Sequence, residues 1–142
     1  MTVRLEHANI AVRDLDAMLA FIAAALPEFA VRGQGRNAQG GRWVHVGTQS
    51  SYLALNEVPK DRTEPWQPYG ERPGLNHLGF VVPDAAAVAG RLAAGGYRES
   101  TVPNDHPHRS RVYFFDSEGN DWEFVQYLAT DPALRNDYGL PD

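Results

Sequence analysis

The chain has no cysteine among its 142 residues, and it has only two methionines. Disulfide bonds, thiolate metal ligands and cysteine nucleophiles are therefore excluded. No apolar run approaches the ~20 residues that a helix needs to cross a bilayer. Residues 1–7 mix charged and apolar side chains, unlike a signal peptide. We expect a cytoplasmic protein that does not act at a membrane.

Positive charge is also scarce: 13 Lys and Arg stand against 18 Asp and Glu, giving a formal net charge of −5. Domains that bind nucleic acid usually carry a basic excess, so we expect no nucleic-acid partner. What the chain does have is an ordinary globular composition, 43% hydrophobic and 11% aromatic. Its length fits a single domain, or two small halves that share a core.

An internal repeat organises the sequence. The segment His7–Asp14 (HANIAVRD) returns as His77–Asp84 (HLGFVVPD), at a constant offset of 70 residues. Each copy alternates as a β-strand does and ends at an aspartate that precedes a helical pattern. Asp14 and Asp84 are predicted N-caps, because an aspartate carboxylate accepts the free amide hydrogens of a first helical turn.

The rest of each repeat is a predicted β-hairpin. Residues 43–56 turn at 47–51, and their counterpart at 112–125 turns at 116–120, at an offset of 69 residues when Leu53 is aligned with Trp122. The stretch between the copies holds four prolines, which predict an irregular connection. The sequence therefore predicts one domain of two similar modules. Their approximate bounds are module 1 at 1–58, a linker at 59–74, module 2 at 75–127 and a polar tail at 128–142.

Strand alternation puts three residues that can bind metal on the same face of their strands, the face opposite the helices. The apolar alternate positions are expected to pack on the helices, which leaves His7, His77 and Glu123 on the opposite face. Imidazole nitrogens and a carboxylate oxygen suit a divalent first-row metal. If the two sheets join into one curved surface, these three side chains can converge on a single ion.

These residues, with the turn DSEGN at 116–120, resemble the vicinal-oxygen-chelate superfamily of glyoxalases, bleomycin-resistance proteins and extradiol dioxygenases, over about residues 7–127. The resemblance implies an α+β fold in which two βαβββ modules form a curved mixed sheet, or cup, around a central metal. The helices would lie on the outer face. The family's ligand positions correspond to His7, Ala54, His77 and Glu123. Fe(II) is the favoured metal, with Mn(II), Zn(II) or Ni(II) as alternatives.

Ala54 bears on the choice of reaction. Glyoxalase I-like members carry a carboxylate there, and a methyl group neither binds metal nor moves a proton. Asn104, His106, Tyr113 and Glu123 resemble the extradiol dioxygenase signature, which implies catalytic roles for His106 and Tyr113. We therefore expect a dioxygenase-like enzyme that acts on a small chelating aromatic substrate. Ser117 departs from this signature, which usually has proline there, and the well-known extradiol enzymes have two such domains.

Five further residues are candidate substrate-binding groups. Most are assigned to the uncovered strand faces, and the last lies in a polar loop where its planar guanidinium could clamp an anion. They are Asn9, His45, Tyr52, Asn56 and Arg109.

Two other functions stay open at this point. One is a manganese-dependent thiol transferase resembling fosfomycin-resistance proteins, or a glyoxalase-like lyase or isomerase. The transferases have threonine where this chain has Asn9. The other is a metal-free protein that binds a small molecule or drug. The resemblance also implies a homodimer, and unpaired sheet edges give a physical reason for association.

Overall fold

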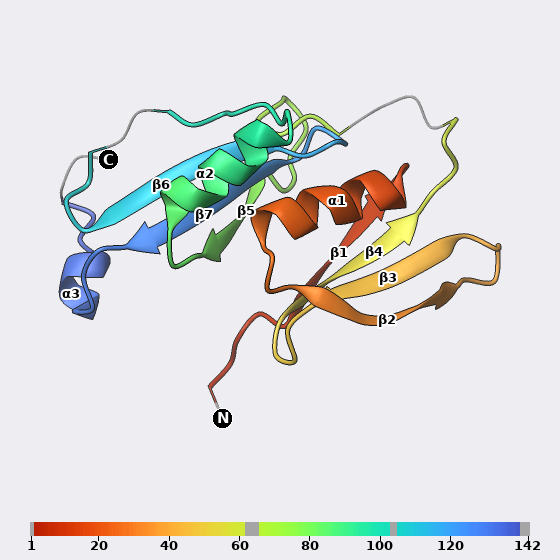
Figure 1. Cartoon of the computed structure of the whole chain (residues 1–142), viewed down its shortest axis with the longest axis horizontal. Coiled ribbons are helices and arrows are strands. Elements are labelled where there is room, and N and C mark those ends of the chain that lie inside the picture. Colours follow the sequence, from red (N-terminus) through yellow and green to blue (C-terminus); the bar gives the residue numbers. More distant parts are fainter. Residues whose placement is uncertain (1, 62–65, 103–104, 140–142) are drawn as a thin grey trace. The chain divides into compact units, whose positions relative to one another are not determined.

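The computed structural model describes residues 2–61, 66–102 and 105–139. The chain forms two compact units, residues 1–65 and 66–142, each with its own sheet and helix (Figure 1). The structure is α+β and consists of two βαβββ-like modules, as predicted. Among the described residues, no helix is long and apolar enough to span a membrane.

The first unit is a four-stranded mixed sheet with one helix. The strand order is β1-β4-β3-β2, with β1 parallel to β4 and the other neighbours antiparallel (Figure 1). The elements are β1 His7–Val12, α1 Leu15–Ala25, β2 Ala30–Arg36, β3 Arg42–Gly47 and β4 Tyr52–Glu57.

The second unit repeats this plan with one strand reduced. Its sheet has the order β5-β7-β6, with β5 parallel to β7. At the place of a fourth strand, Glu99 makes an isolated bridge to Phe114. The elements are β5 His77–Val81, α2 Ala85–Ala94, β6 Arg109–Phe115, β7 Asp121–Tyr127 and a short helix α3 Pro132–Arg135.

The strand registers confirm the internal repeat. Asn9 pairs with Ala54 in the first unit, and Gly79 pairs with Glu123 at the corresponding place in the second. Strands β4 and β7 therefore keep the offset of 69 residues read from the sequence, and β1 and β5 keep the offset of 70. Ala54 occupies the place that Glu123 holds in the other copy.

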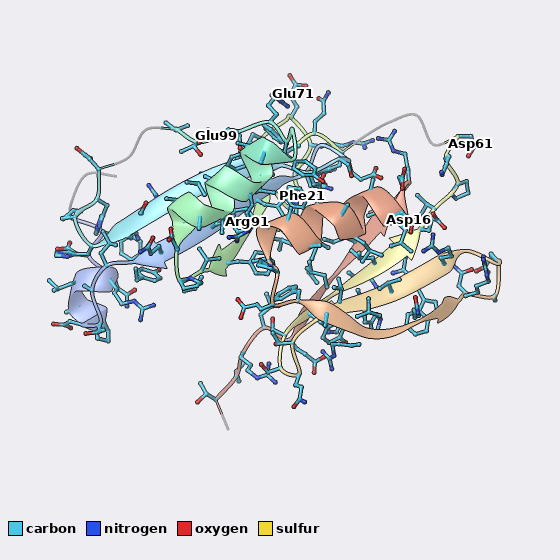
Figure 2. The ribbon with its side chains drawn as sticks, in the orientation of Figure 1. Asp16, Phe21, Asp61, Glu71, Arg91 and Glu99 are labelled. Atoms are coloured by element: carbon cyan, nitrogen blue, oxygen red, sulfur yellow. The ribbon has the colours of Figure 1, made fainter. Side chains whose placement is uncertain are left out.

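Each unit buries one face of its sheet against its own helix. In the first unit α1 contributes Leu15, Met18, Phe21 and Ile22 to the core, and Phe21 is marked in Figure 2. In the second unit Val88 and Leu92 of α2 are buried, together with Phe114, Trp122 and Phe124 of the sheet. The alternate residues of the same strands lie on the opposite face, as the sequence pattern predicted.

Both predicted N-caps are confirmed. The Asp14 carboxylate accepts a hydrogen bond from the Ala17 amide at 3.0 Å, and that of Asp84 accepts one from the Ala87 amide at 2.9 Å. In the first unit, Asp16 of α1 (labelled in Figure 2) also forms a two-pronged ion pair with Arg42 of β3, at 2.9 and 3.1 Å. The caps fix where each helix starts relative to its strand.

Replacing Asp84 by alanine is expected to lower the free energy of unfolding by about 1 kcal/mol, because the first turn of α2 loses its side-chain acceptor. Urea denaturation measures this change. Asp105→Ala is the matched control, since Asp105 is exposed and lies outside any helix or strand, and it is expected to change stability by less than about 0.5 kcal/mol. Equal losses in the two variants would contradict the capping role.

Two features were not predicted from the sequence. The strand β2 reads AVRGQGR, without regular alternation, and a register irregularity between Val31 and Gly33 interrupts its pairing with β3. The described part of the tail is bound to its own unit: the Leu128 amide donates to the His108 carbonyl at 2.9 Å, and Asp131 caps α3. Backbone pairing, which sequence periodicity does not report, holds both segments.

Candidate functional site

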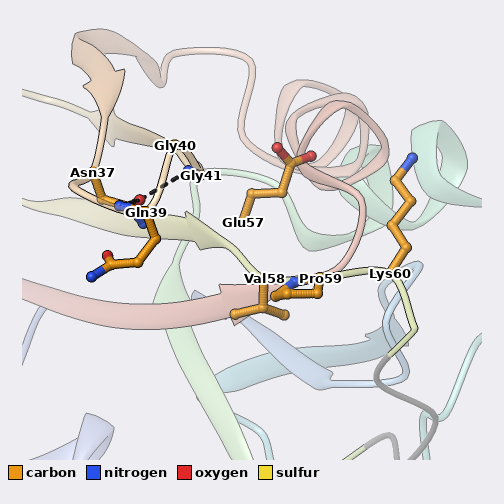
Figure 3. Close-up of a pocket in the computed structure, with 8 residues that line it drawn as sticks. All are labelled: Asn37, Gln39, Gly40, Gly41, Glu57, Val58, Pro59 and Lys60. Atoms are coloured by element: carbon orange, nitrogen blue, oxygen red, sulfur yellow. Dashed lines mark hydrogen bonds between the residues drawn. The ribbon is translucent and has the colours of Figure 1, made fainter.

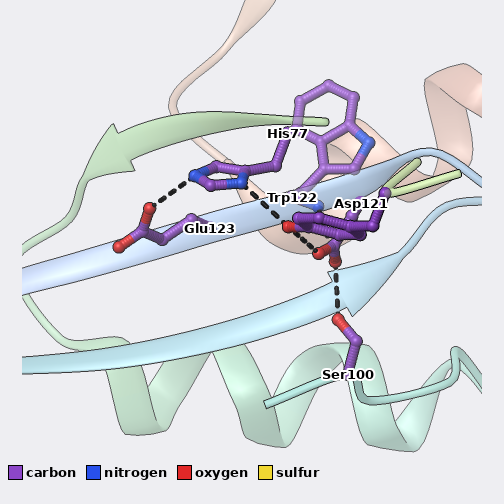
Figure 4. Close-up of polar contacts among 6 residues, drawn as sticks. His77, Ser100, Asp121, Trp122 and Glu123 are labelled. Carbon is purple, nitrogen blue, oxygen red and sulfur yellow. Dashed lines mark hydrogen bonds and ion pairs between the residues drawn. The ribbon is translucent and has the colours of Figure 1, made fainter. Parts of the chain in front are cut away.

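His77 and Glu123 meet on the face of the second unit's sheet that lies opposite α2. His77 begins β5, and Glu123 lies on the adjacent β7 opposite Gly79, which places no side chain between them. The His77 Nε2 atom lies 3.0 Å from the Glu123 Oε2 atom (Figure 4). The side chains are 33% and 13% exposed, so the pair is partly shielded but still open to a ligand.

The other nitrogen of His77 faces the protein. Its Nδ1 atom lies 2.9 Å from the Tyr69 hydroxyl, which donates to the Asp121 carboxylate at 2.8 Å. Asp121 is only 4% exposed and also accepts hydrogen bonds from the Ser100 hydroxyl at 2.5 Å and the Trp122 amide at 3.1 Å (Figure 4). A buried carboxylate with these donors is a fixed anchor for the Tyr69–His77 contact.

Tyr113 completes the group on this face. It lies on β6 directly opposite Glu123, donates a hydrogen bond to that carboxylate, and meets the His77 ring edge-on at 5.6 Å. Burial, and then the nearby Glu123 charge, raise the pKa of Tyr113 to about 12. Tyr113 is therefore a hydrogen-bond donor at neutral pH.

The donor atoms of His77 and Glu123 fit a divalent metal ion. Two ligands bonded at about 2.1 Å and at a right angle stand about 3.0 Å apart, which matches the Nε2–Oε2 distance of 3.0 Å. Metal-bound histidines commonly engage their second nitrogen with an outer partner, as Nδ1 of His77 does. Within residues 2–61, 66–102 and 105–139, however, no cluster of three or more His, Asp or Glu side chains is assembled. The second unit thus supplies a pair of donors.

The third predicted ligand, His7, belongs to the first unit. Its Nδ1 atom lies 3.0 Å from the Glu6 Oε1 atom, so Nε2 is the nitrogen that a metal would take. Its ring stacks on Tyr52 at 4.8 Å. Hydrogen bonding to His7 lowers the pKa of Glu6. In both repeats, therefore, the histidine that begins the first strand engages its Nδ1 atom locally.

Tyr52 and His45 share the sheet face of His7. The His45 ring lies 4.9 Å from the Tyr52 ring and 5.0 Å from the Trp43 ring, and the Arg32 guanidinium sits 4.1 Å above Tyr52. These contacts form a row of rings across β1, β4 and β3. The structure thus settles the direction of His45, which points to the same side as Tyr52.

Asn9 and Asn56 form a direct amide pair on this face, with Asn56 Nδ2 donating to Asn9 Oδ1 at 2.8 Å. Ala54 lies between Asn9 and His45 in the sheet register and is 3% exposed. The first unit therefore gathers four of the five predicted substrate-binding residues: Asn9, His45, Tyr52 and Asn56.

His106 and Arg109 lie at the other end of β7 from His77. His106 is 3% exposed, and its ring contacts the Asp137 carbonyl at 3.0 Å and the His108 amide at 3.2 Å. Arg109 pairs with Tyr127 in the sheet and lies 5.8 Å from the Tyr138 ring. The structure does not bring these two residues to the His77–Glu123 pair. Asn104 lies outside the described residues.

The turn before β7 anchors the strand that carries Glu123. The Asp116 carboxylate accepts hydrogen bonds from the amides of Glu118 and Asn120 and from Trp122 Nε1, the last at 2.8 Å. Trp122 is fully buried beside Glu123 in the chain. Burial raises the pKa of Asp116 above the usual value of 3.8.

Asp116 is expected to make stability depend on pH. Because the pKa of Asp116 is raised on folding, its protonation stabilises the folded state. This contribution to the free energy of unfolding is fully present below pH 3.8 and is lost as the pH rises through the pKa of Asp116 in the folded state. The free energy of unfolding of wild type minus that of Asp116→Asn should therefore increase as the pH falls from about 7 to about 4. Urea denaturation at both pH values checks this. A difference that shrinks on acidification would show that the hydrogen bonds to the carboxylate outweigh burial.

A separate hollow lies at the opposite end of the first sheet from His7 (Figure 3). It has a volume of about 590 Å³, and none of the predicted site residues lines it. Its lining comes from the β2–β3 turn and the end of β4: Asn37, Gln39, Gly40, Gly41, Glu57, Val58, Pro59 and Lys60.

Sequence reasoning missed Tyr69, Ser100 and Asp121. Tyr69 lies in the proline-rich connection, where no periodicity marks a functional residue. Asp121 could have been found from the repeat, though only weakly. It takes the place in the second copy that Tyr52 takes in the first, directly opposite the histidine that begins the copy. Ser100 follows the single bridge that replaces a strand, so no strand pattern pointed to it.

The family model of the Glyoxalase/Bleomycin resistance protein/Dioxygenase superfamily matches residues 4–124. The chain belongs to this superfamily. The resemblance read from His7, His77 and Glu123 is thereby confirmed at the level of the superfamily. Among curated proteins, no match is found.

Solved structures of superfamily type share the fold. A glyoxylase/bleomycin resistance protein/dioxygenase domain from Frankia sp. EAN1pec has a TM-score of 0.73 and 23% identity, covering 89% of this chain and 99% of that one. The fosfomycin resistance protein FosX from Mesorhizobium loti has a TM-score of 0.65 and 19% identity, and the match covers 92% of this chain and 94% of FosX. Glyoxalase I from Leishmania major has a TM-score of 0.68 and 17% identity, and the match covers 88% of this chain and 87% of that enzyme. At these identities the likeness concerns the fold.

Proposed function

We propose that this protein is a metal-dependent enzyme that binds a small substrate through two neighbouring oxygen atoms. The observation that carries the proposal is the His77–Glu123 pair, whose Nε2 and Oε2 atoms lie 3.0 Å apart while Nδ1 of His77 is engaged by Tyr69. A histidine and a carboxylate with this spacing are suitable donors for one divalent ion.

His7, His77 and Glu123 would hold the ion, with His7 contributed by the first unit. The bound ion would supply Lewis-acid polarisation of a substrate oxygen. Tyr113 would donate a hydrogen bond where negative charge develops, since its raised pKa keeps it protonated. The Asn9–Asn56 amide pair and the rings of Tyr52 and His45 would contact the rest of the substrate.

The finer proposal is an extradiol-type dioxygenase that uses Fe(II). Two histidines and one carboxylate with open positions suit Fe(II) oxygen chemistry. Tyr113 supports this reading, because it hydrogen-bonds Glu123 and faces His77. His106 and Arg109 enter this proposal through their sequence positions alone, since their described contacts are with Asp137, His108 and Tyr138.

A manganese-dependent enzyme of the fosfomycin-resistance type is the second candidate. Fold similarity supports it: FosX from Listeria monocytogenes, solved with Mn(II) and sulfate, gives a TM-score of 0.67 at 16% identity and covers 96% of this chain. A variant of that protein was solved with Mn(II) and 1S,2S-dihydroxypropylphosphonic acid, a vicinal diol. The asparagine at position 9, where the transferases have threonine, argues against the thiol-transfer reaction.

Metal content and turnover distinguish these functions. The protein would be purified without added metal, analysed for bound metal, and then loaded separately with Fe(II) under anaerobic conditions and with Mn(II). The iron form would be given catechols and oxygen, and the manganese form an epoxide with water or a thiol. The measurements are oxygen uptake, the absorbance of a yellow ring-opened product, and epoxide consumption.

Each outcome bears on the proposal. Ring-opened product from a catechol supports the dioxygenase, whereas addition to the epoxide without oxygen uptake supports the second candidate. A protein that binds neither metal, yet binds small aromatic ligands, would overturn the enzyme proposal in favour of a metal-free binding protein.

We also infer that the protein forms a homodimer. Strands β1 and β2 end the first sheet, and unpaired edges favour association of copies. Light scattering after size-exclusion chromatography is expected to give twice the mass of the 15.7 kDa chain. A monomeric mass at micromolar concentration would contradict this.

A further inference from the structure

The connection before β5 carries Tyr69 in an unusual backbone conformation. Among the described residues, Tyr69 is the one non-glycine residue with positive φ, at 62°. This left-handed region is unfavourable for an L-residue, because its Cβ atom comes too close to the following carbonyl oxygen. Its amide donates to Asn76 Oδ1 at 2.8 Å, and Trp66 Nε1 donates to the Leu75 carbonyl at 2.8 Å. The segment 66–76 is thus a fixed strap that leads into His77.

The Tyr69 hydroxyl connects a buried carboxylate with the candidate ligand. A phenol has one proton, and Tyr69 donates it to Asp121 at 2.8 Å. The phenol oxygen, 2.9 Å from His77 Nδ1, then accepts a hydrogen bond from that nitrogen. This order of donors places a proton on Nδ1 and leaves Nε2 facing the Glu123 carboxylate at 3.0 Å. A carboxylate is acceptor-only, so Nε2 donates to Glu123 here, and a metal ion bound at Nε2 would take the place of that proton.

Asp121 is in a position to enforce this order. It is 4% exposed, and its other hydrogen bonds come from the Ser100 hydroxyl and the Trp122 amide. An ionised carboxylate is acceptor-only, so the Tyr69 proton is directed to it and away from His77.

We propose that Tyr69 is a positioning residue, which holds His77 in the Nδ1–H form so that Nε2 binds metal. This inference rests on the proposed metal-dependent function and extends it to a residue that acts through His77. The left-handed backbone of Tyr69 is consistent with this role, since strain persists where surrounding contacts hold a functional side chain.

Zn(II) is the probe, because it is diamagnetic and takes histidine and carboxylate donors. Tyr69→Phe removes the phenol oxygen and keeps the ring. We expect its affinity for Zn(II), measured by competition with a chelating dye, to fall by about 10- to 100-fold, the range for losing an outer partner of a metal-bound histidine. In NMR spectra of ¹⁵N-labelled protein, the His77 Nδ1–H proton is expected to exchange slowly in wild type and to vanish in Tyr69→Phe.

Trp66→Phe is the matched control. It removes a hydrogen bond from the same strap, that to the Leu75 carbonyl, without touching His77. We expect wild-type Zn(II) affinity and a retained Nδ1–H signal in this variant. If Trp66→Phe lost affinity as Tyr69→Phe did, the strap would matter only for folding and the inference would be overturned.

The remaining outcomes distinguish this inference from the proposed function. If wild type and Tyr69→Phe bind Zn(II) equally tightly, the positioning role is wrong while the metal site stands. If wild type binds no Zn(II), the proposed function and the inference both fail. A wild-type spectrum without a slowly exchanging Nδ1–H proton overturns the inference whatever the affinity.

Discussion

Replacing Glu123 by glutamine is expected to weaken divalent-metal binding by more than about 100-fold, because losing a ligand should cost more than losing an outer partner. Glutamine keeps the shape of the side chain and an oxygen that can accept the hydrogen bond from Tyr113. It loses the negative charge that would balance the cation. Titration with Mn(II) or Zn(II), followed by calorimetry, measures the change, and Glu123→Ala is expected to abolish metal retention in a folded protein.

Glu99→Gln is the control for this substitution. Glu99 is exposed and its bridge to Phe114 involves the backbone, so this change removes one negative charge from the same unit without altering the site. Its metal affinity should equal that of wild type. If Glu123→Ala still retained metal and turned over substrate, the assignment of Glu123 as a ligand would be wrong.

Phe124→Ala is expected to lower the free energy of unfolding by about 3–5 kcal/mol, the cost of a large cavity in a packed core. Phe124 is fully buried, neighbours Glu123 in β7, and stacks with Phe80 at 6.4 Å. Urea denaturation followed by circular dichroism measures this change. Because β7 also carries Glu123, metal binding should weaken whenever the variant is partly unfolded.

Val81→Ala is the control on the same sheet. Val81 is 68% exposed, so its truncation is expected to change stability by less than about 0.5 kcal/mol. A loss below about 1 kcal/mol in Phe124→Ala would mean that the core between α2 and its sheet relaxes to fill the cavity. The packing account of the second unit would then be wrong.

Much of the fold could be predicted because the informative signals are local. The strand period of two placed His77 and Glu123 on the face opposite the helix, and the caps at Asp14 and Asp84 follow from short-range chemistry. The repeat added long-range information, since corresponding strands of two similar copies are expected to pair in the same way. β2 escaped prediction because its residues do not alternate and its position depends on pairing with β3.

The site could be predicted only in part, because it depends on contacts between segments that are far apart in the chain. His106 has a plausible spacing to Tyr113 in the sequence, yet its ring contacts Asp137 and His108 at the other end of β7. Spacing along a chain does not specify which way a loop returns. The roles assigned to His106 and Arg109 remain predictions.

By itself, the sequence determined the residue types available for chemistry and the faces they occupy. With no cysteine, histidine and carboxylate are the plausible ligands, and alternation puts His77 and Glu123 on one face. Only the tertiary structure decided which nitrogen of His77 faces Glu123. That choice depends on Tyr69 and Asp121, which lie 8 positions before and 44 positions after His77 in the chain. Hydrogen bonds between segments so far apart exist only once the strap and the sheet have folded together, so no local pattern could reveal them.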